Sequence, residues 1–138
     1  MTDKIEVKWY GHSCMAVTAE GYTVLFDPYA DGSVPGLKLL RVTADMVLCS
    51  HGHGDHNARE CVKLEPAAAG KVCPFTVRKI ESYHDPEGGR LRGTNTIHIL
   101  EAEDFRIGTD RGHSDALSWS RLWIRSDWHS GCIYGAVR

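Results

Sequence analysis

Apolar and polar residues alternate in the first part of the chain with the period of two that is typical of β-strands. The alternation is clearest from Ile5 to Tyr10, where one set of side chains falls on each face of a predicted strand. Two shorter strands are predicted at Cys14–Thr18 and Tyr22–Phe26, joined by a turn at Glu20-Gly21. The Asp27-Pro28 pair is expected to end the third strand, because proline cannot donate to the sheet ladder.

A nearly continuous apolar run follows at Ala44–Cys49 and predicts a strand that is buried on both faces. Three later segments are also predicted to be strands: Phe75–Tyr83, Asn95–Leu100 and Phe105–Ile107. A helix is expected from an N-cap at Asn57 through about Leu64, where it would cover the sheet. Spacing also allows a helix at Ala116–Trp123, although Trp and Ser are only moderate helix formers.

Composition and charge narrow the class of protein. The 138 residues suit one globular domain, and 42% hydrophobic and 25% charged residues are ordinary values for such a domain. The net charge of −2 offers no basic surface for nucleic acid, and no apolar run approaches the roughly 20 residues of a membrane span. The alternating charged and apolar residues of Met1–Lys8 are unlike a signal peptide. We therefore expect a cytoplasmic protein without nucleic-acid or membrane partners.

Four metal-ligand residues occupy six positions directly after the buried strand, in the run His51-Gly52-His53-Gly54-Asp55-His56. Residues two apart on an extended segment point the same way, so His51 and His53 can converge on one ion. Asp55 and His56 would then project toward a second point. Imidazole and carboxylate ligands together suit zinc, iron or manganese better than calcium or magnesium. The alternative, a polar loop without a metal, leaves this concentration of ligand residues unexplained.

The histidine run lies within a series of short motifs in a fixed order. They are Val7–Ser13, Phe26–Tyr29, Ala44–Ser50, Tyr83-His84-Asp85-Pro86 and Arg92–Ile97. In order and spacing they resemble the metallo-β-lactamase superfamily, and within it the branch of hydrolases similar to ascorbate-6-phosphate lactonase. The resemblance implies an α/β (α+β) fold, here the strand-rich N-terminal half of an αββα sandwich. It also implies two divalent metal ions, with Zn²⁺ expected first and Mn²⁺ or Fe²⁺ as alternatives.

The resemblance assigns metal ligands residue by residue. It places His51, His53 and His84 on the first ion, Asp55 and His56 on the second, and Asp110 between the two ions. Asp55 is also the candidate catalytic residue. For Asp110 the motif is incomplete, because the histidine that precedes it in the family is absent from Ile107–His113. A turn at Thr109–Gly112 is therefore a competing interpretation of that segment.

Further residues are implied to lie around the metals, where they would orient ligands or hold substrate: His12, Asp27, Asp85, Arg92 and Asn95. Each also has a simpler explanation. His12 could cap a turn, Asp27 before Pro28 is a common turn pair, and Arg92 could be a solvated loop charge. Asp85 could fix the turn into Pro86.

The resemblance divides the chain into residues 1–113, similar to the N-terminal portion of the superfamily, and an atypical tail at residues 114–138. The tail is rich in Trp, Ser and Arg and resembles no part of the family, so the chain looks C-terminally truncated or altered after His113. A missing second sheet would leave an apolar face exposed, which favours a homo-oligomer.

Two functions remain after these observations. The first is a hydrolase in which metal-bound hydroxide attacks an ester, lactone or phosphodiester bond of a small-molecule substrate. The second is a non-catalytic metal-binding fragment that lacks the other half of the active site. The sequence leaves open whether the chain turns over a substrate.

Overall fold

A computed structural model describes residues 5–64, 71–102, 105–111, 120–126 and 130–135, with side chains up to residue 108. The chain divides into two compact units, residues 1–74 and residues 75–138. Within the described residues, no helix has the length and apolar character needed to cross a membrane.

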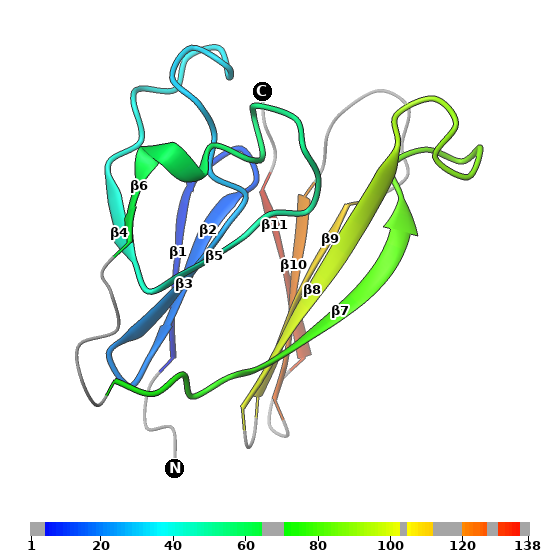
Figure 1. The fold of residues 1–138 in the computed structure, drawn as a ribbon. Helices are drawn as coiled ribbons and strands as arrows, with labels where there is room; N and C mark the ends of the chain where they lie inside the picture. Colours follow the sequence, from blue (N-terminus) through cyan, green and yellow to red (C-terminus); the bar gives the residue numbers. More distant parts are fainter. Residues whose placement is uncertain (1–4, 65–70, 103–104, 112–119, 127–129, 136–138) are drawn as a thin grey trace. The chain divides into compact units, whose positions relative to one another are not determined.

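The first unit is built on a four-stranded sheet with the order β1-β2-β3-β5 (Figure 1). Its strands are β1 (Ile5–Gly11), β2 (Cys14–Ala19), β3 (Tyr22–Phe26) and β5 (Met46–Leu48). The first three pair antiparallel, and β5 pairs parallel with β3. A second, two-stranded parallel pair joins β4 (Val42–Ala44) to β6 (Val62–Leu64). The three predicted N-terminal strands are therefore confirmed.

Strands β2 and β3 form the core of the first unit. Val17, Val24 and Leu25 are fully buried, and Phe26 is 1% exposed. At about 25 cal/mol per Å² of apolar surface removed from water, side chains of this size each contribute roughly 1.5–3 kcal/mol to folding. Because β3 pairs with β5, this core supports the strand from which the histidine loop begins.

Two predictions in the first unit are corrected. The run Ala44–Cys49 is divided at Asp45 between β4 and β5, because the Asp45 amide and carboxylate both bond to Thr23. The predicted helix Asn57–Leu64 is wrong: it is one 3₁₀ turn, η1 (Arg59–Cys61), followed by strand β6. Asn57 provides no side-chain cap. So short a helix is marginal on its own, and pairing of β6 with β4 takes its place.

The second unit is a five-stranded antiparallel sheet with the order β11-β10-β9-β8-β7. Consecutive strands are neighbours, as Figure 1 shows: β7 (Thr76–Tyr83), β8 (Thr94–Ala102), β9 (Phe105–Arg111), β10 (Ser120–Ser126) and β11 (Ser130–Gly135). The strands predicted at Phe75–Tyr83, Asn95–Leu100 and Phe105–Ile107 are confirmed, each within a residue or a few of its observed bounds.

The tail departs from its predicted structure. Ser120–Trp123 of the predicted helix lies in β10, whereas residues 116–119 lie outside the described part of the chain. Pairing with β9 and β11 on either side prevails over a weak helical tendency, and Trp and Ile are good strand formers. The turn interpretation of Thr109–Gly112 is also wrong for its described part, because β9 continues to Arg111.

Candidate metal centre

The histidine run occupies the loop that follows β5, and the segment after β3 holds it in place. Asp27 donates its amide proton to the Leu48 carbonyl at 3.0 Å, which extends the parallel pairing of β3 and β5. Ala30 then donates to the Gly54 carbonyl and Ala58 donates to the Pro28 carbonyl, both at 2.9 Å. The loop is therefore fixed by backbone bonds at three points along residues 48–58.

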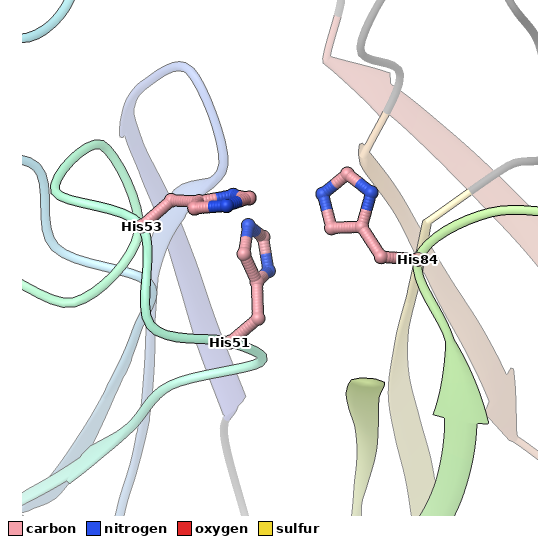
Figure 2. A group of neighbouring side chains, drawn as sticks. All are labelled: His51, His53 and His84. Atoms are coloured by element: carbon pink, nitrogen blue, oxygen red, sulfur yellow. The ribbon is translucent and has the colours of Figure 1, made fainter. Parts of the chain in front are cut away.

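The imidazoles of the loop gather on one side of it. His51 and His53 have ring centroids 4.7 Å apart with planes at 85°, an arrangement that Figure 2 shows. The His51 ring also lies 4.2 Å from that of His56, centroid to centroid. His53 is exposed, His51 is half-buried and His56 is fully buried. The spacing of two between His51 and His53 thus produces the convergence expected of it.

A second group of donors joins this loop to the turn between β1 and β2. His12 Nε2 lies 3.0 Å from Asp55 Oδ2 and 3.2 Å from His56 Nε2. His56 Nε2 lies 3.4 Å from the same Asp55 oxygen, which closes a triangle of three ligand atoms. His12 and His56 are buried, whereas the Asp55 side chain is 32% exposed. We call these three residues the His12 triangle.

The backbone of the β1–β2 turn is shaped to present His12. The pairing of β1 with β2 shifts register between Trp9 and Gly11, and bulges of this kind redirect side chains. Gly11 has φ +106° and His12 has φ +51°, so two successive residues are left-handed. A Cβ on Gly11 would lie 2.9 Å from the end of the Leu37 side chain, which would have to move, but the left-handed φ is the stronger reason for glycine at this position.

Two side chains fasten the same turn. Trp9 donates its indole Nε1–H to the His12 carbonyl at 2.9 Å, and the buried Tyr29 hydroxyl donates to the Tyr10 carbonyl at 2.9 Å. A left-handed non-glycine residue costs about 1–3 kcal/mol and persists only where its surroundings hold it. The left-handed conformation of His12 is therefore held by its surroundings: the register shift, Gly11, Trp9 and Tyr29.

Asp27 and Ser50 form a hydrogen-bond network beneath the histidines. The Asp27 carboxylate accepts from the Ser50 amide and the Ser50 hydroxyl, both at 2.7 Å, and from His56 Nδ1 at 3.1 Å. The single Ser50 proton is donated to Asp27, so Ser50 Oγ accepts from His51 Nδ1 at 2.9 Å. Both His51 and His56 thus carry their proton on Nδ1 and direct a lone pair from Nε2 away from the network.

The histidines also lower the pKa of Asp55. Partial burial by itself would raise the pKa of this carboxyl, but neighbouring His56 and the hydrogen bond from His12 lower it below the ordinary value. The carboxylate therefore stays ionised and available as a ligand at neutral pH.

The donor set fits a divalent metal ion. Ligand atoms about 2.0–2.2 Å from a tetrahedral ion lie about 3.3–3.6 Å apart, and neighbouring ligands of an octahedral ion lie about 3.0 Å apart. The edges of the His12 triangle, 3.0, 3.2 and 3.4 Å, span the same distances. Neutral imidazole and carboxylate are ligands that zinc, manganese and iron all accept.

The remaining candidates belong to the second unit. His84 follows β7 and donates its amide proton to the Gly93 carbonyl at 3.0 Å; it is the third histidine drawn in Figure 2. Asn95, on β8, is buried and donates from Nδ2 to Ser82 Oγ. Arg92 is exposed. Asp110 lies within β9 opposite Arg121, and its side chain is outside the described part of the structure.

Asp85 organises the loop between β7 and β8. Its carboxylate accepts four backbone amide protons, from Glu87, Gly89, Leu91 and Arg92, at 2.7–3.2 Å. Burial would raise the pKa of this carboxyl, but the four amide donors lower it. The observed contacts are those of the turn-fixing role that the sequence offered as the simpler explanation.

Sequence reasoning missed two aspects of the centre. Ser50 was given no role there, although it bonds both Asp27 and His51. His12 was expected at the mouth of a metal site and instead lies among the candidate ligand atoms themselves. The only signal for Ser50 was its position directly before His51.

With the fold and the donor loop described, comparison with known proteins gives the family. Residues 6–114 match the family described as the β-lactamase superfamily domain. The chain belongs to this family. The strand-rich half of a metallo-β-lactamase fold, predicted from the sequence, is confirmed by a crystal structure from Thermotoga maritima, described as a proposed Zn-dependent hydrolase of that superfamily. The TM-score is 0.52 at 27% identity, covering 76% of this chain and 48% of that one.

Similar curated proteins carry the same kind of description. A UPF0173 metal-dependent hydrolase of Geobacillus sp. (strain WCH70) is 31% identical over 105 residues, and one of Bacillus cereus (strain B4264) is 32% identical over 107 residues. In both cases the match covers 75% of this chain and 44% of the relative. The chain therefore spans less than half the length of the curated relatives it matches.

Proposed function

We propose that this protein is a metal-dependent hydrolase of small molecules that uses the loop from His51 to His56 as its metal-binding core. The observation that carries the proposal is the convergence of three imidazoles on that loop, with ring centroids 4.2 and 4.7 Å apart. Membership of the β-lactamase superfamily and relatives named as metal-dependent hydrolases support it.

The proposed donors fall into two sets. His51 and His53 serve the first ion together with His84 of the second unit, and Asp55 and His56 serve the second ion, with Asp110 a further candidate between them. Zn²⁺ is the first choice of metal, and Mn²⁺ or Fe²⁺ would suit the same donors. When bound, such ions lower the pKa of water and stabilise negative charge on a carbonyl or phosphoryl oxygen.

The residues of the chain have definite roles in this proposal. Asp27 holds the His56 proton on Nδ1 directly, and it holds the His51 proton on Nδ1 through Ser50. In both histidines Nε2 is then the atom that would bind an ion. Asp55 is the proposed catalytic residue, because its carboxylate is a third exposed and can accept a hydrogen bond from the attacking water. Arg92, exposed in the β7–β8 loop, is a candidate for holding an anionic group of the substrate.

The proposed reaction is attack of water on an ester, lactone or phosphodiester. A metal-binding protein without turnover is the second candidate, and it shares the loop. The test is metal content per chain of the purified protein by elemental analysis, beside hydrolysis of p-nitrophenyl esters, simple lactones and bis(p-nitrophenyl) phosphate. His53→Ala removes one proposed ligand, and His98→Gln is the matched control, a buried histidine on β8 outside both donor sets.

Close to two ions per chain are expected, with turnover of one of the three substrates. His53→Ala should lose an ion and the activity together, whereas His98→Gln should keep both. One ion per chain with no hydrolysis would support the second candidate. A chain that takes up no divalent ion would overturn both.

A further inference from the structure

We propose that His12 is a metal ligand, and that its Nε2 completes a three-donor site with Asp55 and His56 within the first unit. The inference rests on the proposed function in one respect, that the chain binds divalent metal. It goes further by adding a donor from the β1–β2 turn to the second ion.

The geometry of the His12 triangle carries the inference. Its three ligand atoms come from two segments more than 40 positions apart, and each lies within 3.4 Å of the other two. Such spacing is that of neighbouring ligands around one ion with bonds of about 2.0–2.2 Å. Because Asp27 keeps the His56 proton on Nδ1, the His56 Nε2 atom faces His12 as a lone pair.

Hydrogen bonding alone accounts poorly for this arrangement. Two acceptors, Asp55 Oδ2 and His56 Nε2, both face the Nε2 atom of His12. Without an ion, one His12 proton must be shared between Asp55 and His56, at 3.0 and 3.2 Å. An ion in the middle of the triangle would satisfy all three lone pairs at once.

The construction of the turn supports the same role. A simple turn cap requires no left-handed φ at His12, no register shift at Gly11 and no fastening of the turn by Trp9. Backbone strain of this kind gathers at sites where a side chain must be presented in one position. His12 is also only 7% exposed, so its ring is directed inward and not into solvent.

The test is binding of Co²⁺ and Zn²⁺ to the full chain after removal of metal. Stoichiometry and affinity come from equilibrium dialysis, and the ligand set comes from the visible absorption of bound Co²⁺. His12→Gln keeps a hydrogen-bonding side chain but supplies no imidazole, and His98→Gln is the matched control. His12→Gln should lower the affinity for one of the two ions. The loss should exceed the roughly 10- to 100-fold that follows when only the hydrogen-bond partner of a ligand is removed. The Co²⁺ spectrum of the variant should change at that site only.

The outcomes separate this inference from the proposed function. If His12→Gln matches the parent in stoichiometry, affinity and Co²⁺ spectrum, His12 is not a ligand, while the hydrolase proposal stands. If the parent binds no ion, both fail. A measurement on the parent covers the case in which His12→Gln does not fold. In ¹⁵N-histidine NMR spectra, Zn²⁺ should shift Nε2 of His12 and His56 and leave His98 unchanged; an unshifted His12 would overturn the inference.

Discussion

Asp27 is the residue on which most of the candidate centre depends. It is left-handed, with φ +46°, and that conformation turns its carboxylate toward Ser50 and His56 while its amide still pairs with Leu48. One oxygen, Oδ2, accepts from both the Ser50 hydroxyl and His56 Nδ1. A single carboxylate therefore sets the protonation pattern of one candidate ligand for each ion.

This arrangement predicts a difference between two substitutions. Asp27→Asn places an amide N–H or a weaker acceptor against His56 Nδ1, which favours the tautomer protonated on Nε2. Both ions should bind about 10- to 100-fold more weakly, the usual cost of losing a partner that orients a ligand. Ser50→Ala removes the hydroxyl bonds to Asp27 and His51 but keeps the bond between Asp27 and His56, so binding of the ion at His51 should weaken more than binding of the ion at His56.

Equilibrium dialysis with Zn²⁺ measures the affinities of the two variants, and the visible spectrum of Co²⁺ bound to each variant shows which site has changed. Ser33→Ala is the matched control for Ser50→Ala, because Ser33 bonds only the Ala30 carbonyl in an exposed loop. If Ser50→Ala lowered the affinity for both ions equally, the proposal that Asp27 orients His56 directly and His51 through Ser50 would be contradicted.

The donor loop was predictable from the sequence because its residues are neighbours in the chain. His51, His53, Asp55 and His56 are found by spacing alone. The association of His12 with Asp55 and His56 depends on a register shift in β1 and a left-handed turn, neither of which has a periodic signature. Ser50 acts through its hydroxyl proton, a property that only the position of Asp27 reveals.

At the scale of elements, strands were predicted well and helices were not. Strands β1 and β7 could be found from their alternation, and β2 and β3 from short runs joined by the turn at Glu20-Gly21. Val62–Leu64 and Ser120–Trp123 were expected in helices because their spacing tolerates a helix. Pairing partners distant in sequence, Val42–Ala44 for one and Phe105–Arg111 for the other, determine their strand conformation. Weak local preference yields to such pairing.

The junction of β4 with β5 depends on a buried ion pair. Asp45 bonds the Thr23 amide at 2.8 Å with Oδ2, and its Oδ1 lies 2.6 Å from Lys71 Nζ. The Asp45 side chain is 4% exposed and that of Lys71 is 26% exposed. Burial by itself would raise the pKa of Asp45, but the bonds from Lys71 and Thr23 lower it below the ordinary value.

Stability should therefore depend on pH through Asp45. A carboxyl with a lowered folded-state pKa stabilises the fold fully above its unfolded pKa of about 3.9, and the contribution is lost as pH falls through the folded value. Asp45→Asn should cost about 1–2 kcal/mol of unfolding free energy at neutral pH, since the amide oxygen can still accept from Thr23. Below about pH 4 the stabilities of the variant and the parent should begin to converge.

Urea unfolding between pH 7 and pH 3 measures the effect. Asp31→Asn is the control, because Asp31 is an exposed loop aspartate. A difference between parent and Asp45→Asn that stayed constant across this range would show that the charge of Asp45 contributes nothing.

At the scale of the whole molecule, the proposed metal ligands come from both units. The His12 triangle, His51 and His53 all belong to residues 1–74, whereas His84 belongs to residues 75–138. His84 begins the β7–β8 loop. In this loop the backbone amides of Glu87, Gly89 and Arg92 donate to the Asp85 carboxylate. These amides exchange with solvent only when the loop opens, so their exchange reports on events at His84.

Hydrogen exchange with and without Zn²⁺ therefore tests the ligand role proposed for His84. An ion that binds only the closed state lowers the population of the open state, and with it the exchange rate, by as much as about 100-fold at a concentration 100 times its Kd. Exchange should slow in Ser50–Asn57 and also at Glu87, Gly89 and Arg92. His84→Ala should abolish the effect in the β7–β8 loop and keep part of it in the first unit. If Zn²⁺ slows exchange within residues 1–74 alone, His84 is not a ligand, and the metal centre belongs entirely to the first unit.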